Sequence, residues 1–158
     1  MQFPVSPYRR AVIRQTVFGG CLIALCASCQ AAGPPAAHEV IVPATDYAFQ
    51  VAKELPVGPV SFRLDNRGKV AHEMALGQLK AGVSVDSVMS YVSHGGDPGN
   101  LSDGVVGILI AEAGKMSLGT VQAELVAGHT YMMICQFKDT DSSPPHIAMG
   151  MTASFVAK

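Results

Sequence analysis

Hydrophobic and polar residues alternate with a period of two in several segments of this chain. In residues 60–65 and 121–125, apolar side chains stand at every second position. This is the period of a β-strand that buries one face. Further strands are expected at residues 39–42, 47–51, 72–79, 105–110, 130–135 and 151–157. The side chains expected to face the core are Val60, Phe62, Leu64, Val121, Leu125, Tyr131 and Phe155.

One segment has a helical period instead. In residues 84–92 the apolar side chains are Val85, Val88, Met89 and Val92, and the pair Gly95-Gly96 follows. This spacing predicts a short helix that needs packing for stability, because valine is a poor helix former. About eight short strands with one helical insertion predict an all-β fold, a Greek-key antiparallel β-sandwich.

Tyr131 supports this fold class. It follows Leu125-Val-Ala-Gly-His-Thr, a strand end and a turn. The pattern resembles a tyrosine corner, in which the phenol hydroxyl bonds to the backbone a few residues upstream and fixes a crossover between sheets.

The first twenty-nine residues have the composition of an export signal. Arg9, Arg10 and Arg14 are followed by an uncharged apolar stretch at 16–27. This stretch is shorter than the roughly twenty residues that span a bilayer, but it suits a signal peptide. The run Leu-Cys-Ala-Ser-Cys that ends at Cys29 resembles a bacterial lipoprotein cleavage box, so Cys29 is expected to become the lipidated first residue. Ordinary signal-peptidase cleavage nearby is the alternative.

The rest of the chain has the size of one domain. Residues 30–158 carry all 12 Asp and Glu and 8 of the 11 Lys and Arg, a net charge of 8 − 12 = −4. No Lys/Arg run is present, which argues against nucleic acid as a partner. We divide the chain into a signal segment at 1–29, a Pro/Gly/Ala tether at 30–37 and a single domain at 38–158.

After removal of the signal, Cys135 is the one cysteine left besides Cys29. Exported proteins usually pair their cysteines, so a solitary one suggests a ligand, a reactive thiol or a buried small hydrophobe. His72 precedes it, and His146 and Met151 follow it. A thiolate, two imidazoles and a thioether are the donors of a blue copper site, with a trigonal His₂Cys plane and a weak axial Met.

The spacing of these residues resembles a known family. Asn66-x-Gly68 before His72, Tyr131-x-x-x-Cys135, and His146 four residues before a Gly-Met pair are similar to the plastocyanin/azurin cupredoxins. The resemblance implies a cupredoxin-like sandwich with one copper ion. By this analogy His72, Cys135 and His146 are the strong ligands, and Met151 is the axial ligand that opens the last strand.

One spacing departs from the family pattern. Ten residues, 136–145, separate Cys135 from His146, where the plastocyanin-like pattern has very few. Lengthening a flexible closure from two to ten residues costs about 1.4 kcal/mol, whereas metal coordination contributes on the order of 10 kcal/mol. Loop entropy therefore does not forbid copper, and the open question is whether the long loop moves His146 away from the metal.

Each candidate also has a structural interpretation. Cys135 could be an inert core thiol, His72 a solvated residue at a strand end, and Met151 a core residue with Met149 as the rival axial ligand. The other methionines of the expected strands, Met74, Met132 and Met133, are expected to pack in the core. The other histidines, His38, His94 and His129, are expected to be exposed to solvent.

These observations predict a copper-binding protein of the cell envelope, a one-electron carrier without enzymatic activity. Its partners would be a redox protein or a copper donor or acceptor, and the lipid at Cys29 would anchor it to a membrane. The alternatives are a periplasmic copper-delivery protein and a copper-free cupredoxin-fold interaction module. A thiol hydrolase using Cys135 and His146 lacks an oxyanion motif and a positioned acid.

Overall fold

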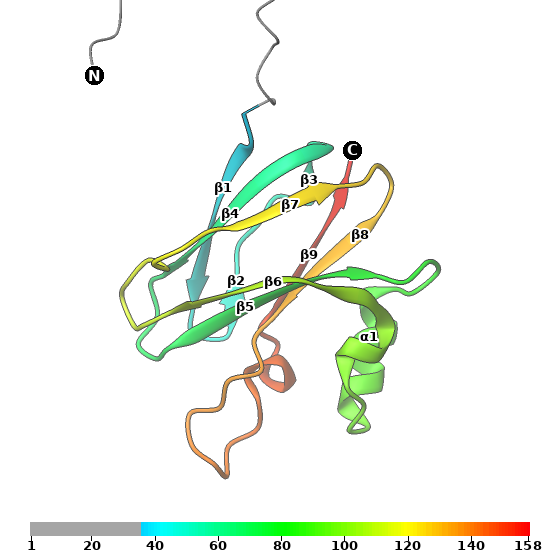
Figure 1. The fold of residues 1–158 in the computed structure, drawn as a ribbon. Coiled ribbons are helices and arrows are strands. Elements are labelled where there is room, and N and C mark those ends of the chain that lie inside the picture. Colours follow the sequence, from blue (N-terminus) through cyan, green and yellow to red (C-terminus); the bar gives the residue numbers. More distant parts are fainter. Residues whose placement is uncertain (1–35) are drawn as a thin grey trace, which may run out of the picture. The chain divides into compact units, whose positions relative to one another are not determined.

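The computed structural model describes residues 36–158, which form two β-sheets packed face to face (Figure 1). The predicted signal segment, the lipidation residue Cys29 and all but the end of the predicted tether lie outside these residues. One sheet has the order β2-β1-β4-β7 and the other the order β3-β9-β8-β5-β6. The strands are β1 His38–Thr45, β2 Ala48–Phe49, β3 Glu54–Leu55, β4 Gly58–Asn66, β5 His72–Leu79, β6 Ser102–Ala111, β7 Val121–Leu125, β8 Thr130–Ile134 and β9 Thr152–Ala157.

The β-sandwich predicted from the alternating pattern is confirmed. Every second residue of β4 and β7 is buried, as a strand with one core face requires. All the side chains expected in the core are buried, with exposed fractions of 8% or less: Val60, Phe62, Leu64, Val121, Leu125, Tyr131 and Phe155.

The sheets are mixed rather than wholly antiparallel. β1 pairs with β4 in parallel, and the short β3 pairs in parallel with β9. The expected strand at 47–51 is reduced to β2, because Tyr47 adopts a left-handed backbone conformation with φ of 67°. Such a φ is uncommon outside glycine and turns the chain instead of extending it.

Tyr131 forms the predicted corner. Its hydroxyl accepts a hydrogen bond from the backbone N–H of Val126 at 3.0 Å and donates to Oε1 of Gln78 at 3.1 Å. The ring stacks on Phe155 with a centroid distance of 5.3 Å. One side chain thus joins the β7–β8 turn to β5 and β9.

Helix α1, Val85–Ser93, confirms the helical segment. Ser84 caps its N-terminus by accepting a hydrogen bond from the Ser87 N–H. Val88 is buried against Leu79 and Met132, so the helix covers the outer face of the five-stranded sheet at β5 and β8. No helix among residues 36–158 is long and apolar enough to cross a membrane.

Two single-turn 3₁₀ helices complete the described chain, η1 at Pro98–Leu101 and η2 at His146–Met149. η2 ends the long connection between β8 and β9, which projects from one end of the sandwich (Figure 1). This end carries the candidate ligands.

Candidate metal centre

Three predicted ligands converge at this end of the sandwich. Nδ1 of His72 lies 3.2 Å from Nδ1 of His146, and Sγ of Cys135 lies 4.0 Å and 3.4 Å from the same two atoms. All three side chains are buried, with exposed fractions of 1% or less. His72 and Cys135 are 63 residues apart in the sequence, but they meet because β5, which His72 starts, pairs with β8, which ends just before Cys135.

The triangle has the size that a first-row transition metal requires. Bonds of about 2.0–2.3 Å to imidazole and thiolate, as zinc makes them, separate the donors of a trigonal plane by about 3.5–3.8 Å. The observed edges of 3.2, 3.4 and 4.0 Å bracket these values. A shared proton can link only two of the three donor atoms, whereas one metal ion can bind the lone pairs of all three. The three donors therefore fit a metal ion.

Asn66 fixes the turn that leads to His72. Its buried amide nitrogen donates to the carbonyls of Val70 at 2.8 Å and Ala111 at 3.0 Å, and its Oδ1 accepts the N–H of Gly68 at 2.9 Å. These bonds close residues 66–70 into a compact turn tied to the end of β6. His72 therefore starts β5 at a fixed height in the sandwich.

The outer nitrogen of His72 has no hydrogen bond. Nε2 is buried and lies 3.5 Å from Oδ1 of Asp46, at the outer limit of hydrogen-bond distance. The same oxygen accepts the N–H of Lys69 at 2.7 Å, which lowers the pKa of the Asp46 carboxyl. Burial lowers the pKa of His72, and the nearby carboxylate opposes that effect. The imidazole is thus biased towards the neutral form that a metal needs.

Cys135 directly follows β8. Its Sγ accepts the backbone N–H of Glu73 at 3.4 Å, and the Glu73 side chain in turn accepts the N–H of Gln136 at 2.7 Å. Burial raises the pKa of the Cys135 thiol, while the N–H groups of Glu73 and Phe137 lower it. Those N–H groups are placed to stabilise a thiolate once a cation makes it form.

The long loop does not displace His146. At its base the N–H of His146 donates to the carbonyl of Phe137 at 2.8 Å, and the N–H of Ile147 donates to the carbonyl of Cys135 at 2.7 Å. These two bonds bring the ends of the loop together, so the extra residues bulge outward. His146, the first residue of η2, lies beside Cys135 in spite of the ten intervening positions.

Asp139 and Tyr47 surround the outer edge of His146. Oδ1 of Asp139 lies 3.1 Å from Nε2 of His146, and Oδ2 accepts the hydroxyl of Tyr47 at 2.6 Å. The Tyr47 ring packs edge-on against His146 with a centroid distance of 5.0 Å. The pKa of the Asp139 carboxyl is lowered, first by the Tyr47 hydrogen bond and then by His146.

Met151 and Met149 differ in exposure. Met151 is fully buried in the core cluster that contains Cys135, whereas Met149 has an exposed fraction of 36%. The N–H of Met151 donates to the carbonyl of His146, and its own carbonyl accepts the N–H of Cys135. The backbone therefore ties Met151 to both neighbouring candidate ligands.

The remaining sulfur and imidazole side chains lie in other surroundings. Met74 and Met133 are in the main core, and Met132 packs beneath helix α1. His38 and His94 are exposed and His129 is partly so. None of these six was predicted to be a ligand.

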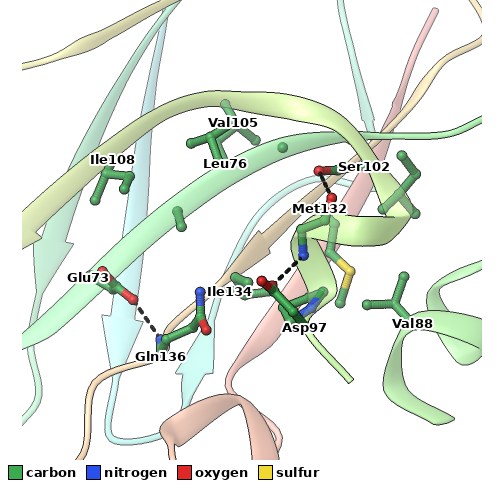
Figure 2. Close-up of a pocket in the computed structure, with 15 residues that line it drawn as sticks. Glu73, Leu76, Val88, Asp97, Ser102, Val105, Ile108, Met132, Ile134 and Gln136 are labelled. Carbon is green, nitrogen blue, oxygen red and sulfur yellow. Dashed lines mark hydrogen bonds between the residues drawn. The ribbon is translucent and has the colours of Figure 1, made fainter. Parts of the chain in front are cut away.

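A groove of about 250 Å³, lined at one end by Glu73 and Gln136, lies between the outer face of the five-stranded sheet and the α1–η1 segment (Figure 2). Figure 2 shows the Glu73–Gln136 hydrogen bond at one end and Asp97 and Ser102 near the other. Ile108, Ile134 and Met132 make the lining largely apolar.

Sequence reasoning missed Asp46, Tyr47 and Asp139. Asp46 lies just before the strand expected at 47–51 and Tyr47 is its first residue, whereas the structure forms a turn there; Asp139 stands in a polar loop with Asp141 and two serines. No local pattern distinguishes them. Only the fold, which brings Tyr47 to a residue 92 positions away, gives them a place at the site.

Comparison with known proteins identifies the fold. No family model and no curated protein sequence matches the chain. Among solved structures, auracyanin B matches with a TM-score of 0.53 and 21% identity over 80% of this chain and 92% of its own. Reduced auracyanin from Roseiflexus castenholzii matches with a TM-score of 0.51 and 18% identity over 78% and 99% of the two chains. The described part of this chain therefore has the cupredoxin fold.

Proposed function

We propose that this protein is a one-electron carrier that holds a single copper ion with His72, Cys135, His146 and Met151. The observation that carries the proposal is the buried triangle of two Nδ1 atoms and one Sγ. A His₂Cys plane with a weak axial thioether is the donor set of blue copper sites. Auracyanins, whose fold this chain shares, are blue copper proteins.

Bound copper would supply the exchange between two oxidation states that differ by one electron. The residues of the chain would bind the copper, shield it and hold its ligands in place. Burial of the ligands keeps water from the metal. Backbone bonds at the base of the loop and around Asn66 hold the ligands in place, so little has to move when the charge changes. A site that needs little movement suits one-electron transfer.

Copper delivery is the less favoured function. A delivery site would be helped by several accessible methionine sulfurs that receive Cu(I). Met149, with an exposed fraction of 36%, is accessible near His146, but Met74, Met132 and Met133 are buried, with exposed fractions of 4% or less. The copper-free module is less favoured because it offers no reason for three donor atoms to converge in a buried position.

We propose further that the protein is exported and anchored at the cell envelope by lipid on Cys29. The charged start, the short apolar stretch and the Leu-Cys-Ala-Ser-Cys run support this location. A redox protein of the same compartment would then be its partner.

Copper titration of the protein purified after expression of the full chain tests the function. We expect one copper per chain, an intense visible thiolate-to-copper absorption and reversible voltammetry. Cys135→Ser should abolish the absorption, and His72→Ala should weaken copper binding severely, whereas His94→Ala, at an exposed histidine, should change neither. A chain that takes up no stoichiometric copper would instead be the copper-free module. One that holds only Cu(I) and exchanges it readily would be the delivery protein.

A further inference from the structure

The two histidines of the site differ at their outer nitrogens. Nε2 of His146 hydrogen-bonds to Oδ1 of Asp139 at 3.1 Å, whereas Nε2 of His72 has no hydrogen bond. Oδ1 of Asp46 accepts the N–H of Lys69 at 2.7 Å and lies 3.5 Å from Nε2 of His72. Of the two carboxylate–imidazole contacts, the one at His146 is therefore the shorter, at 3.1 Å against 3.5 Å.

Asp139 is itself held in position. Its second oxygen accepts the Tyr47 hydroxyl at 2.6 Å, and the Tyr47 ring packs against His146. Tyr47 keeps its left-handed backbone, an uncommon conformation for a tyrosine, in this arrangement. Tyr47, Asp139 and His146 thus form a connected chain from the β1–β2 turn, through the long loop, to the metal centre.

We propose that Asp139 is a positioning residue that orients His146 and tunes the copper ion towards its oxidised state. The inference rests on the proposed function. A carboxylate that accepts the Nε2 proton fixes the tautomer whose Nδ1 lone pair faces the metal. It also makes the imidazole a stronger donor. A stronger donor favours the more highly charged Cu(II) over Cu(I), and so lowers the reduction potential.

This proposal gives the long loop a role. The ten residues between Cys135 and His146 include Asp139. Because the backbone bonds at the base hold the two ends of the loop together, the side chain of Asp139 can reach His146. The segment that departs most from the short-loop pattern would then supply a residue that sets the redox properties of the site.

Asp139→Asn and Asp139→Ala test the proposal on copper-loaded protein. The first keeps a neutral acceptor and the second removes the acceptor, so the potential should rise in the order Asp, Asn, Ala. For Asp139→Asn we expect the preference for Cu(II) over Cu(I) to fall about tenfold, which equals about 59 mV for a one-electron couple. In ¹H–¹⁵N spectra of the Cu(I) protein, the Nε2 proton of His146 should be protected from solvent exchange and lose that protection in Asp139→Ala.

Asp46→Asn is the matched control. The side chains of Asp46 and Asp139 are similarly exposed, at 32% and 29%, and each lies close to one Nε2. Asp46→Asn removes the same charge at a longer contact to its imidazole, 3.5 Å against 3.1 Å, so it should change the preference less than threefold. Equal shifts in the two Asn variants would mean that charge alone acts, and would overturn the positioning role. An unchanged potential in Asp139→Ala would overturn it as well.

The outcomes separate this inference from the proposed function. If the unmodified protein binds no copper, the proposed function fails. If it binds copper with the expected absorption and the Asp139 variants keep its potential, only the role of Asp139 fails. Thermal unfolding of the metal-free variants checks that each substitution in this surface loop leaves the fold intact.

Discussion

Gly68 lies so close to Asp46 that a methyl group at position 68 would overlap Oδ1 of the carboxylate. This oxygen receives the N–H of Lys69 and lies beside His72, so the glycine permits the turn before the first candidate ligand. We expect Gly68→Ala to cost about 1–3 kcal/mol of stability, as overpacking does. Urea unfolding of the metal-free protein measures it.

Gly119→Ala is the control for this prediction. A methyl group at position 119 would meet nothing within 4 Å, so its effect should stay within about 0.5 kcal/mol. Similar unfolding midpoints for the two variants would show that the turn adjusts easily and that Gly68 is not required there.

The turn before His72 also depends on Asn66. Asn66→Asp keeps an acceptor for Gly68 but removes the two donations to Val70 and Ala111 and places a charge against their carbonyls. A loss of roughly 2–4 kcal/mol is expected, because buried carbonyls lose their donor. Asn100→Asp, on the exposed η1 turn, is the matched substitution and should change the unfolding free energy little. A stable Asn66→Asp protein would contradict the proposed clamp.

Tyr131→Phe should destabilise the sandwich by about 1–2 kcal/mol, because the Val126 N–H and Gln78 Oε1 lose their shared partner. The ring and its stacking on Phe155 remain, which isolates the hydroxyl. Tyr91→Phe provides the comparison, since Tyr91 is 40% exposed and its hydroxyl takes part in one long contact of 3.4 Å. Equal denaturation midpoints for both variants would argue against the corner.

Met151→Leu should leave copper bound but raise its reduction potential, since an axial thioether tunes the metal more than it holds it. Met149→Leu should leave both properties unchanged, because that side chain is exposed and Met151 is not. Voltammetry and copper stoichiometry of the two variants decide between them. A shift in potential confined to Met149→Leu would reverse the assignment.

The fold could be predicted from sequence where one face of a strand meets the core. Residues 121–125 form a strand with the predicted bounds and bury every second side chain. Residues 72–79 also form a strand with the predicted bounds, although helix α1 covers part of their outer face. The parallel pairing of β1 with β4 and the two-residue β3 could not be predicted in this way. Pairing partners depend on which strands meet in space, and two residues carry no period.

Some residues of the candidate site could be predicted from the sequence and others could not. His72, Cys135, His146 and Met151 could be selected because their side chains have the chemistry of metal donors and stand in an informative order. Asp46, Tyr47 and Asp139 have no such mark, since surface turns commonly contain these residues. Their place at the site follows from tertiary contacts that the chain makes only when folded.

The long loop between Cys135 and His146 has a base that is closed by backbone hydrogen bonds and a polar tip at residues 140–143. Beyond Asp139, the polar tip bonds mainly to itself, through the Ser143 N–H to the Thr140 carbonyl and through the hydroxyls of Thr140, Ser142 and Ser143. Residues 140–143 therefore form a small hydrogen-bonded unit of their own, which borders Asp139. A label or a recognition peptide inserted in this tip would therefore stand close to the candidate metal centre, separated from His146 by Asp139.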